Sequence, residues 1–130
     1  LSKSSALPGD HAGQETRSYR YPYGPVGVIT PFNFPLEIPA LQATSAVFMG
    51  NQPIVKVDEK VAIVFEQFLR LMHHSGMPKD TMNHIYCSGP VANDLLVRFD
   101  SRMLLFTGSQ SVAEKLSRDL RGRVKLEDAG

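Results

Sequence analysis

The chain has 130 residues, of which 42% are hydrophobic and 21% charged, a composition that fits one globular domain and excludes a disordered or fibrous protein. Its formal net charge of +1 gives no general attraction to nucleic acid or to an anionic membrane surface, so we expect neither as a partner. No apolar stretch reaches the roughly 18 residues of a membrane-spanning helix, and the single cysteine excludes an internal disulfide.

The first part of the chain lacks hydrophobic periodicity. Residues 1–22 are rich in Ser, Gly and charge, and we expect an extended arm or linker there. Residues 26–30 are apolar and β-branched and predict a buried strand, whereas residues 36–49 predict a helix. Pro39 fits the first turn of this helix, where a missing N–H costs least, and Gly50 fits its end, because glycine adopts positive φ without strain.

The alternation of strand and helix continues to the end of the chain. Residues 53–57 predict a strand, and Asp58 is placed to cap the next helix, with Glu59 in its first turn. That helix runs to about His74, because apolar residues recur at helical spacing. The remaining predicted elements are strands at 83–86, 102–106 and 123–126 and helices at 91–99 and 109–120.

Five strands that alternate with four helices predict an α/β fold, a Rossmann-like parallel sheet of about five strands with helices on both faces. In this interpretation, residues 23–130 form one domain. Because the chain begins with Leu1, and Gly130 closely follows an apolar run, we expect the sequence to be part of a longer protein. Ligands bind such sheets at the carboxyl ends of the strands, so the candidate site residues are those that follow the strands.

Asn33 lies in a turn after the first predicted strand, with a proline on either side. Pro31 and Pro35 restrict the backbone around this one amide side chain. One interpretation is that Asn33 is a fixed hydrogen-bond donor toward an oxyanion. The alternative, which residue chemistry alone favours, is that Asn33 caps the following helix.

Two further turns carry residues suited to a dinucleotide. Lys56 and Glu59 can hold the two hydroxyls of a ribose, and a carboxylate there repels a 2′-phosphate and so favours NAD over NADP. The alternative is a solvated charge pair at a helix start. Ser109 precedes a helix whose free N–H groups and dipole favour a phosphate, and the alternative is that Ser109 is an ordinary N-cap.

The remaining residues with reactive side chains are Glu127, Cys87 and two histidines. Glu127 comes at the end of the last predicted strand, where it is either a general base or merely a polar strand end. Cys87 follows an apolar pair and no motif flanks it, so we expect a buried small hydrophobic residue rather than a nucleophile. His73 and His74 lack a His-Glu-x-x-His pattern, so no metal site is predicted.

The order and spacing of these turns match one protein family over residues 21–130. The matching segments are 31–36, 50–51 with 56–59, 76–78, 106–109 and 126–127. With these segments the chain resembles the aldehyde dehydrogenase superfamily. Residues 30–39 and 125–130 look most like its plant-type Δ1-pyrroline-5-carboxylate dehydrogenase branch. No Gly-x-Gly-x-x-Gly is present, and this superfamily binds NAD without one.

The resemblance implies a role for each candidate residue. Asn33 matches the asparagine that stabilises the oxyanion, and Glu127 matches the glutamate that activates the deacylating water. The residues that match cofactor-binding positions are Ile29, Thr30, Pro31 and Phe32 in the turn along NAD, Lys56 and Glu59 at the adenosine ribose, and Ser109 at the pyrophosphate. The nucleophilic cysteine of the family lies beyond the position of Glu127 and is not among these 130 residues.

The resemblance also implies an activity, the NAD-dependent oxidation of an aldehyde to a carboxylic acid. The branch implies L-glutamate 5-semialdehyde as substrate, L-glutamate as product, proline catabolism and a mitochondrial location, with the cytoplasm as the location otherwise. We expect the full-length protein to be a homo-oligomer and the isolated chain to be inactive, since the nucleophile is missing. The alternatives are a truncated isoform that binds NAD without catalysis and an interaction module that pairs its edge strand at 123–126 with another chain.

Overall fold

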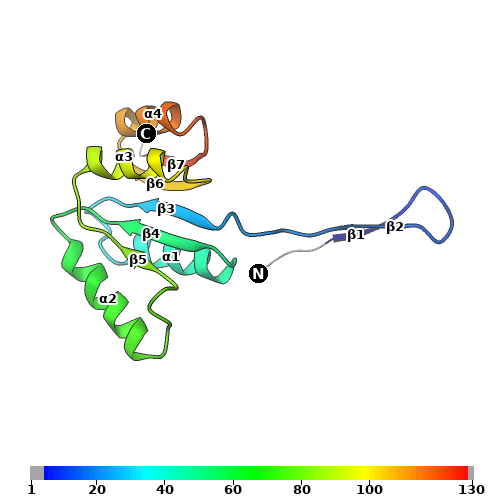
Figure 1. Cartoon of the computed structure of the whole chain (residues 1–130), viewed down its shortest axis with the longest axis horizontal. Helices are drawn as coiled ribbons and strands as arrows, with labels where there is room; N and C mark the ends of the chain where they lie inside the picture. Colours follow the sequence, from blue (N-terminus) through cyan, green and yellow to red (C-terminus); the bar gives the residue numbers. More distant parts are fainter. Residues whose placement is uncertain (1–4, 129–130) are drawn as a thin grey trace.

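A five-stranded parallel sheet organises the body of the protein in the computed structural model, which describes residues 5–128. The strand order is β5-β4-β3-β6-β7 (Figure 1). The strands are β3 (Pro25–Ile29), β4 (Gln52–Lys56), β5 (Asn83–His84), β6 (Leu104–Gly108) and β7 (Val124–Asp128). The connecting helices are α1 (Glu37–Phe48), α2 (Ala62–His74), α3 (Gly89–Arg98) and α4 (Gln110–Asp119). The predicted α/β Rossmann-like fold is therefore confirmed.

Helices cover both faces of the sheet, two on each (Figure 1). On one face, α1 and α2 enclose a core that includes Val28, Val55 and Phe65. On the other face, α3 and α4 enclose a second core that includes Leu104 and Leu116. Alternate residues of a strand point to opposite faces, so the same strands contribute to both cores. Within residues 5–128, no helix is both long and apolar enough to cross a membrane.

The strand order reverses at β3, which pairs with β4 on one side and with β6 on the other. From β3 the chain runs through β4 to the edge strand β5, then crosses back to β6 and β7. The loops after β3 and β6 therefore leave neighbouring strands for opposite faces of the sheet. In open α/β sheets, a crevice for ligands forms at this point, outside the carboxyl ends of the strands.

The middle of β3 requires a residue without a side chain. A Cβ atom at Gly27 would lie 2.7 Å from Leu96 Cδ2 and 2.9 Å from Leu104 Cδ1. Both distances are shorter than van der Waals contact. Glycine therefore lets α3 and β6 pack directly against the central strand.

Helix α1 ends at the glycine that the sequence predicts. Gly50 has a φ of +80°, and its N–H donates to the carbonyl of Val47 at 2.8 Å. The N–H of Asn51 donates to the carbonyl of Ala46 at 3.0 Å. These two bonds form the Schellman arrangement that a glycine after a helix favours, so the predicted helix end at Gly50 is confirmed.

Helix α2 begins later than the sequence predicts. Its first residue is Ala62 and its N-cap is Val61, so the predictions that Asp58 caps the helix and that Glu59 lies in its first turn are wrong. Asp58 Oδ1 instead accepts a hydrogen bond from the N–H of Lys60 at 3.0 Å. A short side chain bonded to a nearby N–H stabilises a turn here rather than a helix start.

Strands β6 and β7 extend two residues beyond their predicted ends, whereas β5 has two residues instead of the predicted four. In the extension, Thr107 pairs with Glu127 and Gly108 pairs with Asp128. These residues are polar or small, so the apolar pattern of the sequence stops before them. Pairing with the neighbouring strand, and not local pattern, sets where these strands end.

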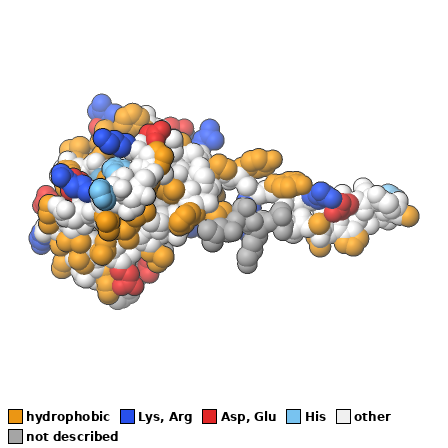
Figure 2. All heavy atoms as spheres, turned by 90° about the horizontal axis from the view of Figure 1, so that it is seen from below, with side chains coloured by type: hydrophobic (Ala, Val, Ile, Leu, Met, Phe, Trp, Pro, Cys, Tyr) orange, Lys and Arg blue, Asp and Glu red, His pale blue; other side chains and the backbone are white. Residues whose placement is uncertain are grey.

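An antiparallel hairpin of β1 (Ser5–Pro8) and β2 (Glu15–Ser18) stands away from the body (Figure 1). Apolar side chains are exposed along it (Figure 2). It lies in the segment predicted as an extended arm, whose residues 1–4 are outside the described part of the chain. The sequence did not predict these strands, because every residue in them is exposed and no hydrophobic alternation marks them.

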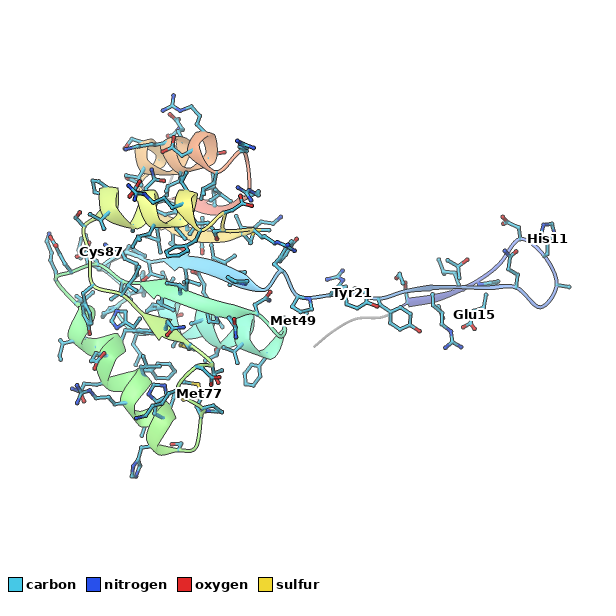
Figure 3. The ribbon with its side chains drawn as sticks, viewed as in Figure 1. His11, Glu15, Tyr21, Met49, Met77 and Cys87 are labelled. Carbon is cyan, nitrogen blue, oxygen red and sulfur yellow. The ribbon has the colours of Figure 1, made fainter. Side chains whose placement is uncertain are left out.

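The arm joins the body at the amino ends of the strands, on the side opposite the predicted site (Figure 3). Asn51 Oδ1 accepts hydrogen bonds from the backbone N–H groups of Tyr23 at 2.7 Å and Gly24 at 3.2 Å. This one side chain therefore fixes the chain where it enters β3, while Tyr21 and the hairpin lie beyond the body (Figure 3).

Candidate cofactor-binding and active site

A cleft of about 600 Å³ opens at the carboxyl ends of β3, β6 and β7. Three predicted site residues that are far apart in the sequence line it together, namely Asn33, Ser109 and Glu127. Pro31 and Phe32, which the sequence places along the cofactor, line the same cleft. The fold thus gathers at one place the two candidate catalytic residues and the candidate phosphate site, and their roles stay predictions.

The turn between β3 and α1 leaves Asn33 exposed at the cleft. Helix α1 begins at Glu37, and its N-cap is Leu36, whose side chain makes no capping hydrogen bond. Asn33 is three residues before this N-cap, so the alternative that it caps the helix is wrong. Asn33 instead lines the cleft, and its role as a donor to an oxyanion stays a prediction.

Glu127 is held beside Thr107 by the register of β7 against β6. The hydroxyl of Thr107 donates to Glu127 Oε2 at 3.4 Å, a long hydrogen bond. Gln42 Nε2, from α1, donates in turn to Thr107 Oγ1 at 3.0 Å. The sequence analysis quoted Thr107 only as part of a motif and missed Gln42 altogether, since nothing near Gln42 in the sequence points to the cleft.

Ser109 is the N-cap residue of α4, as one alternative predicted, but its side chain makes no capping hydrogen bond. The first N–H groups of α4 and the Ser109 hydroxyl therefore remain available at the cleft, where the helix dipole favours an anion. A Cβ atom at Gly108 would lie 2.7 Å from Phe106 Cζ, so glycine at this position leaves room for the Phe106 ring. The phosphate site at Ser109 stays a prediction with suitable geometry.

Lys56 and Glu59, predicted as a ribose-binding pair, line two different hollows. Lys56 lines an apolar hollow of about 310 Å³ between the sheet and α3, together with Ile29. Glu59 lines a hollow of about 260 Å³ at the loop after β5. No ion pair joins the two side chains in the described part of the chain. Their joint hold on a ribose stays a prediction.

The turns after β3 and β4 contact each other beside the cleft. The N–H of Thr30 donates to the carbonyl of Lys56 at 3.2 Å. Lys60 Nζ lies 5.2 Å from the ring centre of Phe32, within the range of a cation–π contact. Thr30 is 3% exposed, and its hydroxyl is buried without a partner among the described residues. A buried hydroxyl in that state is suited to a polar group of a ligand or to a bound water.

Cysteine and histidine side chains do not add a second reactive centre to the cleft. Cys87 lies in the loop between β5 and α3 (Figure 3) and shares the hollow of Glu59. It is partly exposed, so the prediction that it is buried is wrong. Strand β5 ends at His84, and the residues after it therefore lie in a loop at the surface. Within residues 5–128, no group of three metal-ligating side chains is present.

A cluster of titratable side chains lies at the edge strand β5, apart from the cleft. Glu66 accepts hydrogen bonds from Arg70 Nε at 2.8 Å and from the hydroxyl of Tyr86 at 3.1 Å. The ring of His84 packs edge-on against Phe65, and its Nδ1 lies 3.6 Å from Glu66 Oε2, too far for a strong hydrogen bond. Burial lowers the pKa of His84 below its ordinary value of 6.5, and the nearby Glu66 carboxylate opposes that shift only in part.

We expect the stability of the chain to fall as the pH drops below about 6.5, the ordinary pKa of histidine. The folded state keeps His84 neutral to a lower pH than the unfolded chain does. The unfolded chain therefore binds more protons in this window, and the loss is complete once the pH passes the lower folded pKa. The urea midpoint at pH 7.5 and 5.5 measures the effect. His84→Leu should reduce the difference, whereas His74→Gln, at an exposed position, should retain it. An unchanged difference in His84→Leu would contradict this prediction.

Comparisons with known proteins agree on one family. The model of the Aldehyde dehydrogenase family matches residues 2–130. Delta-1-pyrroline-5-carboxylate dehydrogenase 12A1, mitochondrial, of Arabidopsis thaliana is 55% identical over 130 residues, which cover 100% of this chain and 23% of that protein. A probable aldehyde dehydrogenase of Linum usitatissimum is 53% identical over 130 residues, which cover 100% of this chain and 24% of that protein. The chain thus spans about a quarter of the length of these relatives.

A solved structure shares the fold as well. The NAD-dependent aldehyde dehydrogenase from Sinorhizobium meliloti superposes with a TM-score of 0.90 at 27% sequence identity, over 98% of this chain and 26% of that chain. The family model, the two relatives and this structure point to the same family. The chain belongs to the aldehyde dehydrogenase family.

Proposed function

We propose that this chain provides the NAD-binding part and two catalytic residues of an enzyme that oxidises L-glutamate 5-semialdehyde to L-glutamate. The observation that carries the proposal is the cleft that Asn33, Ser109 and Glu127 share at the carboxyl ends of the strands. The 55% identity to the relative named delta-1-pyrroline-5-carboxylate dehydrogenase supports the choice of aldehyde. A place in proline catabolism, a mitochondrial location and a homo-oligomeric full-length protein belong to the same proposal.

The residues at the carboxyl edge of the sheet fit a dinucleotide. The start of α4 and the Ser109 hydroxyl suit a pyrophosphate, because the N-cap side chain of Ser109 makes no capping hydrogen bond. The buried, unpartnered hydroxyl of Thr30 suits a polar group laid along the turn after β3. Lys56 and Glu59 would hold the adenosine ribose, and the carboxylate of Glu59 would disfavour the 2′-phosphate of NADP.

The proposed reaction uses Asn33 before the loss of hydride and Glu127 after it. A cysteine thiolate adds to the carbonyl carbon of the aldehyde, and the side-chain N–H of Asn33 donates to the oxyanion that forms. The adduct then loses a hydride and becomes a thioester, and NAD bound at the cleft would be the hydride acceptor. Water then attacks the thioester while Glu127 takes its proton, so that the acid and the thiolate are released. Cys87 lies in a different hollow, so we expect another segment to supply the nucleophile.

A second candidate function rests on the exposed edge of the sheet. Strand β7 pairs only with β6 among the described strands, and an unpaired edge can add a strand of another chain. In that case the chain would be an interaction module, or a form that binds NAD without catalysis. Cofactor binding and turnover distinguish these possibilities from the enzyme.

Cofactor binding is tested on the chain itself by calorimetric titration with NAD and with NADP. We expect binding of NAD and weaker binding of NADP. Glu59→Gln should narrow this difference by relieving repulsion of the 2′-phosphate, whereas Glu114→Gln, an exposed change on α4, should leave it unchanged. Absence of any NAD binding would sink the proposed role of the chain in holding the cofactor.

Catalysis is tested in a chimera, defined as the Arabidopsis relative with its matching 130 residues replaced by this chain. We expect steady formation of NADH from glutamate 5-semialdehyde. We also expect Asn33→Ala to lower kcat by about 10²–10³-fold, the usual effect of removing one oxyanion donor. A folded chimera that forms no NADH with this aldehyde would refute the proposed activity.

A further inference from the structure

A chain of hydrogen bonds links the interior of α1 to the candidate general base. Gln42 Nε2 donates to Thr107 Oγ1 at 3.0 Å, and the Thr107 hydroxyl donates to Glu127 Oε2 at 3.4 Å. We propose that Gln42 is a positioning residue that, through Thr107, holds the Glu127 carboxylate toward the water it activates. This inference rests on the proposed function, since it assigns Gln42 to the deacylation step.

The number of protons on each group decides which one donates in each of the two hydrogen bonds. An ionised carboxylate can only accept, and a threonine hydroxyl has one proton to donate. When that proton goes to Glu127, the Thr107 oxygen must accept from elsewhere, and the amide N–H of Gln42 supplies this bond. Without a donor at position 42, the hydroxyl is free to rotate away, and Glu127 loses its described partner.

The three hydrogen-bonded side chains come from three separate elements, so the bonds fix the position of these elements relative to one another. Gln42 comes from α1, Thr107 from the central part of the sheet in β6, and Glu127 from the edge strand β7. Among the described strands, β7 pairs on one side only, so its end has fewer constraints here than that of a central strand. Through these bonds, α1 sets the direction of the Glu127 side chain on β7.

Among the described residues, the side chain of Gln42 makes its one hydrogen bond with Thr107. Its second polar atom, Oε1, is buried without a hydrogen-bond partner among the described residues. Burying such an atom opposes folding, so an apolar residue of similar size should be tolerated. If Gln42 served only stability, its replacement by an apolar residue would lower the free energy of unfolding. This contrast separates a positioning role from a structural one.

The test measures single-turnover and steady-state NADH formation in the chimera, for Gln42→Leu and for Gln67→Leu, a matched change at an exposed position on α2. Gln42→Leu should leave the rate and amplitude of the first turnover unchanged, because acylation and hydride loss precede the use of Glu127. Steady-state turnover should fall by about 5–10-fold, the usual effect of one hydrogen bond. The urea midpoint should not fall. Gln67→Leu should resemble the parent chimera.

A double-mutant cycle tests the path through Thr107. In a Thr107→Val background, Gln42→Leu should cause no further loss of steady-state turnover, because the shared bond is already gone. Additive losses, an equal fall of both turnover phases, or normal turnover in Gln42→Leu would each overturn the inference. A parent chimera without any NADH formation would instead refute the proposed function, so the two failures are distinguishable.

Discussion

Glu127→Gln in the chimera should allow a normal first turnover and strongly slow every later one. The first NADH forms before Glu127 is needed, so a burst close to one equivalent per active site is expected. Glutamine cannot accept the proton of the attacking water, so steady-state turnover should fall by about 10²–10⁴-fold, the range for loss of a general base. Rapid-mixing absorbance at the NADH band measures both phases.

The structure provides a matched control for this change. Glu114 is also exposed and also accepts a side-chain hydrogen bond, from Gln110 at 3.0 Å, but it lies on α4 and does not line the cleft. Glu114→Gln should leave both phases as they are in the parent. If Glu127→Gln abolished both the burst and the steady-state turnover, the assignment would be contradicted, because Glu127 would then be needed before the release of hydride.

Phe65→Ala should lower the free energy of unfolding by about 3–5 kcal/mol, the usual range for truncating a buried phenylalanine. Phe65 is fully buried in the core that α1 and α2 form with the sheet. Its ring also packs against Phe68 and His84, with centroid distances of 5.7 Å and 5.1 Å. Removal of the ring leaves a cavity that this close-packed region can fill only in part.

Urea unfolding of the chain, followed by circular dichroism, measures this loss from the shift of the midpoint at constant slope. Phe48→Ala is the matched control, since Phe48 lies at the end of α1 and is 69% exposed. Its effect should stay within about 0.5 kcal/mol. A loss below about 1 kcal/mol for Phe65→Ala would contradict the packing around α2.

Local sequence signals predicted most of the fold because they do not depend on partners. Residues 26–30 and 53–57 are mostly apolar and rich in β-branched side chains, and they correspond to β3 and β4, each of which has buried residues within the sheet. Gly50 ends α1 because its own backbone conformation permits the turn. By contrast, Asp58 satisfied the composition rule for an N-cap but bonded to Lys60 in a turn, since the start of α2 depends on how that helix packs.

Part of the site was also predictable from the sequence. The topological rule for open α/β sheets directs attention to residues after strands, and this rule found Asn33, Ser109 and Glu127, which share one cleft. It could not show that Lys56 and Glu59 line separate hollows, because that depends on how the following turn folds back. Nor could it find Gln42, whose only link to the cleft is a contact with a residue 65 positions away.

The sequence by itself determined the alternation of strands and helices from β3 onward, the family and the turns that carry the candidate chemistry. The elements and turns depend on residues that are close together in the chain, and the family follows from the order and spacing of the turns along it. Only the tertiary structure decided that Glu127 lies opposite Thr107, that Gln42 reaches that pair, and that Asn33 does not cap α1. The physical reason is that strand register and helix packing arise from contacts between distant segments, which local patterns do not record.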